Sequence, residues 1–291
     1  MLQHYVEIFI SGFTDYFNYL IHEILNPSFY NYFYLLIWIS IIVWVLEIIF
    51  PWRKNQSIFR RDFFLDAFYM FFNFFIFNLI IFNATTKLSS TLFNDMISGF
   101  GFENIEIISI GSLPTSVQLL LIFLLTDFVQ WNIHRLLHSV PFLWKFHKVH
   151  HSVQEMGFAA HLRYHWMESV VYKTLQFIPL ALIGFNTENL FVVYVFQIII
   201  GHLNHSNLNL TYGPLKFVLN NPVMHIWHHS KNLPEGSNGI NFGITLSLWD
   251  YIFKTVFIPH DGKEIELGFQ NISSYPESFI KQTIFPFTKK G

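Results

Sequence analysis

Long apolar stretches occupy much of the first two thirds of the chain. A helix of about 20 mostly apolar residues is long enough to cross the hydrocarbon layer of a bilayer. Residues 33–50, 63–82 and 117–138 fit this pattern, and two shorter stretches follow at 169–185 and 190–202. We predict that these segments are transmembrane helices and that the last two form a helical hairpin.

The two ends of the chain have a different pattern. Residues 2–25 mix apolar and acidic side chains, which fits either an interfacial helix or an imperfect span. The residues after about 205 are more polar and contain Pro and Gly, which is typical of a cap lying on the membrane. We therefore predict a single membrane-embedded domain, 1–291, with an all-α fold: a polytopic helix bundle with a cytoplasmic helical cap.

Basic residues give this arrangement an orientation. The first Lys or Arg is Arg53, and four basic residues cluster between the first two apolar stretches. The positive-inside rule then predicts three cytoplasmic segments: 51–62, 139–168 and 203–291. The segments 84–114 and 186–188 are predicted to lie outside, where Lys87 is the one basic residue.

The composition excludes several other classes of protein. Charged residues make up 12% of the chain, against about 25% in ordinary soluble domains. The formal net charge of −2 and the lack of a basic tract argue against nucleic-acid binding. There is no cysteine, which excludes disulfides, thiolate metal sites and a cysteine nucleophile. Any metal site must use nitrogen and oxygen ligands.

The histidines supply such ligands. Twelve of the fifteen lie between His134 and His229. Three blocks have metal-ligand spacing: His134 with His138; His147 with His150 and His151; and His225 with His228 and His229. Residues i and i+4 share a helix face, whereas adjacent residues diverge by about 100°, so one HxxHH block can serve two metals. The eight imidazoles predict a dinuclear centre, and their chemistry suits iron, zinc, copper or nickel.

This array resembles the signature of the fatty acid hydroxylase/sterol desaturase superfamily of membrane di-iron oxygenases, HxxxH…HxxHH…HxxHH. The resemblance covers about 115–255 and includes segments around the blocks: Asp127-Phe128 and Trp131 before His134-Arg135, Leu143 to Ser152, Arg163 to Glu168, His205-Ser206-Asn207, Gly213-Pro214-Leu215, Asn241-Phe242-Gly243 and Trp249-Asp250. Two positions depart from the family pattern, because Trp166 replaces the usual Pro and Lys254 stands where Gly is more common.

The resemblance implies that the eight block histidines are metal ligands. Folds of this type take further ligands from the helix before the third block, which here offers His202 and His205. We favour His205, because it occupies the position of the family's H-S-N segment. The alternative for His202 is a helix-end residue that binds no metal.

Acidic and basic residues near the blocks have expected supporting roles. Asp127 shares nearly one helix face with His134 and His138, so we expect it to accept a hydrogen bond from a metal-bound imidazole. A pairing of Asp127 with Arg135 or with another helix is the alternative.

Four further residues follow the second block. Arg163, His165 and Glu168 are expected to position substrate or brace the site, and Glu168 is also a possible ligand. His161 joins this set through sequence proximity alone. Asp250, with Trp249, is expected to close the cap over the site.

The implied activity is oxidation of a lipid. Two iron ions would use O2 as co-substrate and electrons from a separate reductase, cytochrome or pterin-type donor to hydroxylate a fatty acyl, sterol or alkylglycerol lipid. Desaturation by the same chemistry is the nearest alternative. The expected location is the bacterial inner membrane or the endoplasmic reticulum, with the metal site on the cytoplasmic face.

Two other classes are less favoured. A metal transporter also carries intramembrane histidines, but transport sites usually lie near the bilayer midplane, whereas these blocks lie at predicted helix ends. An inactive scaffold would be expected to have lost ligands, yet all eight histidines are present.

Overall fold

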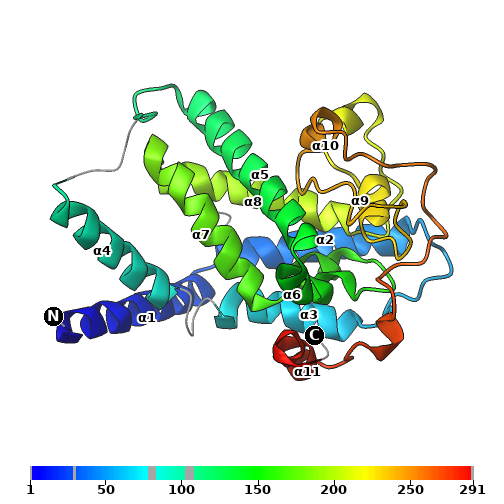
Figure 1. Ribbon diagram of the computed structural model, residues 1–291, viewed down its shortest axis with the longest axis horizontal. Helices are drawn as coiled ribbons and strands as arrows, with labels where there is room; N and C mark the ends of the chain where they lie inside the picture. Colours follow the sequence, from blue (N-terminus) through cyan, green and yellow to red (C-terminus); the bar gives the residue numbers. More distant parts are fainter. Residues whose placement is uncertain (1, 29–30, 78–82, 102–107, 290–291) are drawn as a thin grey trace.

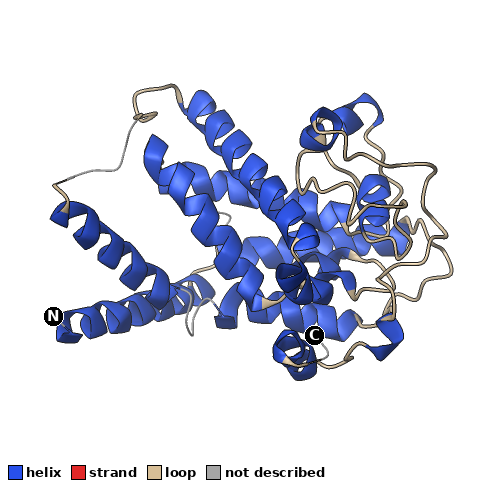
Figure 2. Ribbon diagram, in the orientation of Figure 1, coloured by secondary structure: helices blue, strands red, loops and turns tan. Residues whose placement is uncertain are grey.

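The fold is described from a computed structural model, which covers residues 2–28, 31–77, 83–101 and 108–289. Across these residues the regular structure is helical, and the pairing of extended segments is limited to two isolated bridges, Leu219 with Leu246 and Ser230 with Leu267 (Figure 2). The all-α prediction is thus confirmed for the described part of the chain.

Helices form at the predicted apolar stretches. They are α2 (Tyr32–Ile49), α3 (Phe63–Phe71) continued by a π-helical turn (Phe72–Ile76), α5 (Thr115–Ser139), α7 (Trp166–Ile183) and α8 (Thr187–Asn204). The last part of the stretch predicted at 63–82 lies outside the described residues. A short connection joins α7 to α8, but both helices pack mainly on α5 rather than on each other, unlike the predicted hairpin.

Side chains at the helix starts explain where these helices begin. The Asn31 side chain accepts hydrogen bonds from the backbone N–H groups of Phe33 and Tyr34, which caps α2. At the start of α7, His165 and Glu168 form a reciprocal capping box. Each cap provides hydrogen-bond partners for backbone N–H groups at the start of its helix, and the apolar residues that follow continue the helix.

The helices form a bundle with an irregular region at one end. Helix α5 packs against both α7 and α8, and α2 packs against α8. On the right of Figure 1, the C-terminal third forms loops around α9 (Pro222–His228) and α10 (Leu248–Ile252), and α11 (Phe279–Ile284) lies at the bottom, below α6. This irregular region corresponds to the cap predicted for the residues after about 205, and we call it the cap.

An apolar cluster holds this region to the bundle. Trp52, which follows α2, packs with Met156, Ile226, Trp227 and Leu267, all of them buried. These residues come from segments far apart in the sequence, so their burial fixes α9 against the residues that connect the helices.

The segment predicted as an outer loop, 84–114, contains a helix, α4 (Asn83–Gly99). It packs against α1 (Leu2–Leu25), and the two helices extend side by side from the bundle in Figure 1. Lys87 Nζ lies 2.6 Å from Asp15 Oδ2 across this pair. The prediction of a loop missed this helix because α4 is short of apolar residues and becomes stable by packing on α1.

Length and composition identify one helix among the described residues that could cross a membrane, α5. Residues Phe33–Ile49, Phe63–Ile76 and Glu188–Asn204 are apolar helices of fewer than 18 residues. The number of membrane crossings therefore stays a prediction.

Candidate metal centre

A sharp turn between two helices brings the first two histidine blocks together. Helix α5 ends at Ser139 and α6 (Pro141–His151) begins after one connecting residue, Val140. Pro141 is suited to this first helical position, because its ring presets the backbone and the missing N–H needs no partner there. The turn brings the ends of α5 and α6 together, with their histidines buried between them.

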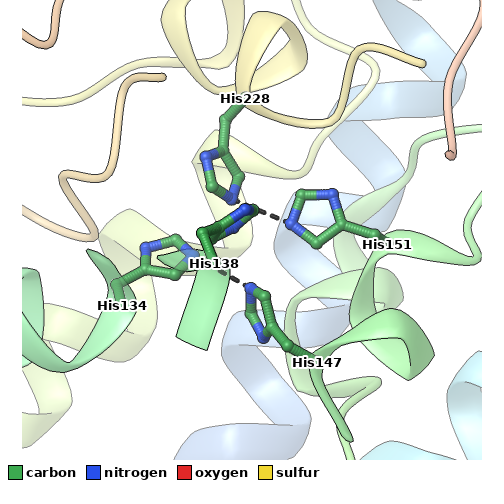
Figure 3. A group of neighbouring side chains, drawn as sticks. All are labelled: His134, His138, His147, His151 and His228. Atoms are coloured by element: carbon green, nitrogen blue, oxygen red, sulfur yellow. Dashed lines mark hydrogen bonds between the residues drawn. The ribbon is translucent and has the colours of Figure 1, made fainter. Parts of the chain in front are cut away.

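Nine buried histidines form two groups, and within each group the ligand nitrogens lie within 4.8 Å of one another. We call them the five-histidine group (His134, His138, His147, His151 and His228, Figure 3) and the four-histidine group (His150, His205, His225 and His229). The eight histidines of the blocks and His205 are thus brought together, as the sequence predicted.

Each HxxHH block supplies both groups. In the block on α6, His147 and His151 enter the five-histidine group, and His150 enters the other. In the block on α9 the distribution is reversed, because His225 and His229 enter the four-histidine group while His228 enters the five-histidine group. The i and i+4 members stay together on one helix face, and the remaining histidine diverges, which is the geometry expected of a helix.

One ring nitrogen of most of these histidines is bound to protein oxygen. In the five-histidine group, Nδ1 of His134 pairs with Phe242 O at 2.7 Å, Nδ1 of His138 with Asn238 O at 3.3 Å, Nδ1 of His147 with Glu168 Oε2 at 2.8 Å and Nδ1 of His228 with Ile240 O at 2.7 Å. In the four-histidine group, Nδ1 of His150 pairs with Arg163 O at 3.0 Å and Nδ1 of His205 with Gly201 O at 2.8 Å. Because a carbonyl oxygen can only accept, the five Nδ1 atoms that face carbonyls carry the proton, and Nδ1 of His147 carries it when Glu168 is ionised.

The other nitrogens face one another. His134 Nε2 lies 3.1 Å from His147 Nε2 in the five-histidine group, and His225 Nε2 lies 2.9 Å from His205 Nε2 in the four-histidine group. With the proton on Nδ1, a neutral imidazole presents a lone pair at Nε2. Converging lone pairs repel each other unless a cation lies between them, so the donor set fits metal ions. Six of the nine histidines are oriented through Nδ1.

Burial keeps these rings in the form that binds metal. It lowers the pKa of His151, His228 and His229 well below the ordinary imidazole value, and the neighbouring histidines lower each pKa further. Neutral imidazole is the ligand form of histidine. The groups therefore need no deprotonation at neutral pH before metal enters.

A loop from the cap supplies two of the accepting carbonyls. Asn241 has a positive φ of 50°, and its side chain donates to the carbonyls of Met224 and Phe257. This conformation turns the carbonyls on either side, those of Ile240 and Phe242, toward the five-histidine group. Sequence reasoning missed these carbonyls, although the Asn241-Phe242-Gly243 motif marks the loop.

Asp127 differs from its expected role. Its carboxylate accepts hydrogen bonds from Trp249 Nε1 at 2.8 Å and from the backbone N–H groups of Thr245 and Leu246. The partner is thus the cap rather than a histidine of the centre or Arg135, because three N–H donors of the 245–249 segment converge on the carboxylate. Of the alternatives, a pairing with another helix fits best, because Trp249 lies on α10.

Asp250 acts in a similar way. It accepts from Trp131 Nε1 of α5 and from the backbone N–H groups of Phe242 and Gly243. Asp250 therefore ties α5 to the loop that carries Phe242 O, in agreement with its expected role in closing the cap.

The residues after the second block have distinct positions. Glu168 contacts the centre directly through His147, whereas Arg163 contacts it through its carbonyl oxygen, which accepts from His150. The Arg163 guanidinium is held by Asp66 at 2.8 Å. His165 lies outside both groups, because its Nδ1 caps α7 and its Nε2 donates to Thr283 O.

His202 also lies outside both groups. Its ring points to His161 and to Ser40 of α2, with Nδ1 2.9 Å from His161 Nδ1 and Nε2 3.1 Å from Ser40 Oγ. His202 and His205 are three positions apart on α8. Their rings point in different directions, so the His205 ring joins the four-histidine group and the His202 ring does not.

A cavity of about 460 Å³ reaches the centre from the bundle. Both groups line it, the five-histidine group through His134 and His147 and the four-histidine group through His150, His205 and His225. Its remaining walls come largely from α7 and α8 and include Leu162, Tyr172, Tyr194 and Ile198. A cavity of this size suits a small molecule or part of a lipid chain.

Comparison with known proteins agrees with this centre. Residues 119–255 match the family model described as fatty acid hydroxylase. The chain is 32% identical to ornithine lipid hydroxylase OlsE of Rhizobium tropici over 61% of its length, and 31% identical to alkylglycerol monooxygenase of Xenopus tropicalis over 49%. It is 26% identical to methylsterol monooxygenase 1-1 of Arabidopsis thaliana over 55%.

The chain covers 53% of the length of OlsE, 31% of the alkylglycerol monooxygenase and 55% of the methylsterol monooxygenase. No solved structure matches the chain. The matched region contains all eight histidines of the three blocks, together with His205 and the loop that carries Phe242. The resemblance to the fatty acid hydroxylase/sterol desaturase superfamily seen in the sequence is thus confirmed for residues 119–255.

Proposed function

We propose that this protein is a membrane-bound, di-iron, O2-dependent oxidoreductase that hydroxylates a lipid. The observation that carries the proposal is the cavity, because one space is lined by both histidine groups and by apolar side chains. A lipid chain in that space would have its C–H bonds beside both metals. The lipid names of the similar proteins, which differ in their substrates, support the class and leave the individual lipid open.

The proposed ligands are the nine histidines of the two groups. Iron bound by them would supply the redox chemistry that activates O2, with electrons delivered by an external donor. Imidazole is a good ligand for iron. The nine rings carry no negative charge, so these ligands would not offset the positive charge of the bound iron.

The residues around the ligands have supporting roles in this proposal. Glu168 orients His147, and Arg163 orients His150 through its carbonyl oxygen. Asp127 holds the cap segment closed over the centre, and His165 fixes the start of α7. The apolar cavity walls would exclude water from the reaction, which protects a reactive site.

The proposed setting is a membrane, with the centre on its cytoplasmic face. Helix α2 supports this, because Trp38, Ile42 and Ile49 lie on its outer side with exposed fractions of 60%, 57% and 58%. Large apolar side chains so exposed on one helix fit contact with lipid. The basic residues that follow α2 are those that the positive-inside rule assigns to the cytoplasm.

The test is to purify the protein from iron-supplemented cells, measure its metal content, and incubate it with O2, a reductant and membrane lipids. We expect about two iron ions per chain and a lipid product that has gained one oxygen atom. A product that has instead lost two hydrogen atoms would identify a desaturase. Full activity in a metal-free sample would contradict the proposal.

Two variants sharpen this test. His150→Ala removes a proposed ligand, so we expect metal content and product to fall together. His260→Ala is the matched control, because His260 lies outside both groups on the cap surface, and it should retain both.

A further inference from the structure

Helix α11, close to the C-terminus, is held on one face by α3 and α7. The Phe279 ring packs against Phe68 and Tyr69 of α3, with ring-centroid distances of 4.8 and 4.9 Å. The carbonyl oxygen of Thr283 accepts a hydrogen bond from His165 Nε2 at 2.9 Å, and His165 precedes the first residue of α7. These contacts place α11 beside α3, as seen at the bottom of Figure 1.

A buried amide completes this attachment. Gln282 Oε1 accepts a hydrogen bond from Tyr69 Oη at 3.0 Å, and Gln282 Nε2 donates to the carbonyl oxygen of Pro276 at 2.7 Å. The carbonyl can only accept, so it fixes which end of the amide faces Tyr69. The buried face of α11 therefore has partners within the protein for its polar and its aromatic groups.

The opposite face of α11 is apolar and exposed. Ile280, Ile284 and Phe287, which lies in the 3₁₀ turn that follows α11 (Phe285–Phe287), have exposed fractions of 68%, 54% and 61%. Their spacing of i, i+4 and i+7 puts them on one side of the segment. We call these three residues the α11 stripe. Large apolar side chains exposed next to one another are typical of a surface that binds a partner.

The position of α11 indicates which partner fits the stripe. Helix α3 also exposes three apolar residues with this spacing, Phe64, Phe68 and Phe71, and Phe68 contacts Phe279 of α11. Helix α3 lies in an apolar stretch that is predicted to enter the membrane, and it begins directly after the predicted cytoplasmic segment 51–62. The α11 stripe is therefore next to a surface suited to lipid, near the cytoplasmic end of α3.

Basic residues accompany the stripe. Lys281 and Lys289 are both exposed. The acidic residue of the same region, Glu277, pairs with Arg61 at 3.1 Å. A helix that combines large apolar side chains with lysines is typical of segments that lie in a membrane interface. There the flexible lysine side chains extend toward the anionic lipid headgroups.

We propose that residues 279–289 form an interfacial anchor, which lies in the cytoplasmic surface of the bilayer with the α11 stripe among the lipid chains. This inference rests on the membrane setting of the proposed function, and it adds a lipid contact made by the C-terminal part of the chain. Because Thr283 O is bonded to His165, the anchor connects the membrane surface to α7, a helix that lines the cavity.

Single cysteines test the anchor, because the chain has none of its own. The full-length protein is labelled with a bimane fluorophore in nanodiscs of phosphatidylcholine and phosphatidylglycerol. Nitroxide-labelled lipid quenches a fluorophore among lipid chains, and iodide quenches one in water. We expect the ratio of lipid quenching to iodide quenching to be several-fold higher at Ile280→Cys and Ile284→Cys than at Ser274→Cys, which is exposed on the cap.

A second experiment removes the stripe while the label stays in place. With the fluorophore at Phe287→Cys, the double substitution Ile280→Ser/Ile284→Ser should abolish quenching by lipid and increase quenching by iodide. Glu277→Ser is the matched control, because Glu277 is exposed in the same region but lies outside the stripe. It should leave the quenching at Phe287→Cys unchanged.

The two quenchers separate the possible occupants of the stripe. Quenching of Ile284→Cys by iodide alone would place the stripe in water and overturn the proposal. Quenching by neither agent would mean that a protein partner or a second copy covers the stripe, which also overturns it. Ile42→Cys, on the exposed side of α2, tests the membrane setting separately. Lipid quenching at Ile42→Cys but not at Ile284→Cys would leave the proposed function in place while the anchor fails.

Discussion

His147 Nδ1 donates a 2.8 Å hydrogen bond to Glu168 Oε2, so a histidine of α6 is oriented by a carboxylate of α7. Both side chains are 3% exposed, which protects the bond from competing water. A carboxylate in this position fixes the ring of a ligating histidine and increases its basicity. The centre therefore depends on how α6 and α7 are packed.

Glu168→Gln removes the charge from this contact and is expected to weaken metal binding by about tenfold or more. Chelator competition on the purified protein measures the effect. Glu266→Gln is the control, because Glu266 lies on the surface and pairs with Lys231. Equal metal affinity in the two variants would show that Glu168 does not orient a ligand.

The two histidine groups differ in how they tolerate the loss of one ring. His229→Ala leaves three histidines in its group, whereas His138→Ala leaves four. We expect the metal content to fall from about two to about one ion per chain in His229→Ala and to stay closer to two in His138→Ala. Elemental analysis after gel filtration gives both values, and the opposite order would contradict the division of ligands.

Asp127→Ala should destabilise the cap. The substitution leaves Trp249 Nε1 and the backbone N–H groups of Thr245 and Leu246 without their acceptor. An unpaired buried donor costs about 1–3 kcal/mol, so we expect a clearly lower melting temperature. If instead the variant melts like wild type and lacks metal, Asp127 acts on the ligands and not through the cap.

The orientation of the chain can be tested with single cysteines, because the sequence has none. Ser112 and Ser274 are both exposed and are predicted to lie on opposite sides of the membrane. In intact cells, a membrane-impermeant maleimide should label Ser112→Cys, and it should label Ser274→Cys only after permeabilisation. The reverse pattern would invert the proposed topology.

The sequence predicts the helices and the set of converging histidines well, because both depend on local spacing. An apolar run long enough for α5 is visible in the sequence, and so is the one-turn separation of His147 from His151. Helix geometry then determines which histidines share a face.

The surroundings of the histidines could not be predicted in this way. Phe242 O and Ile240 O orient His134 and His228, but a backbone carbonyl has no signature in the residue type. Asp127 lies on nearly the same helix face as His134, as expected of a hydrogen-bond partner. Only the packing of the cap shows that Asp127 instead accepts a hydrogen bond from Trp249. His202 was a candidate ligand by spacing, yet its ring direction depends on Ser40, a residue far away in the sequence.

The reversed distribution of the blocks on α6 and α9 has a consequence for how such a centre can change over time. A substitution at one histidine affects one group, but the loss or displacement of either block removes ligands from both groups at once. Deleting the block on α6 or the block on α9 would therefore disrupt both proposed sites together. A descendant that kept both of these blocks could lose one proposed site only through changes elsewhere, for example at His134 and His138 of α5 or at His205.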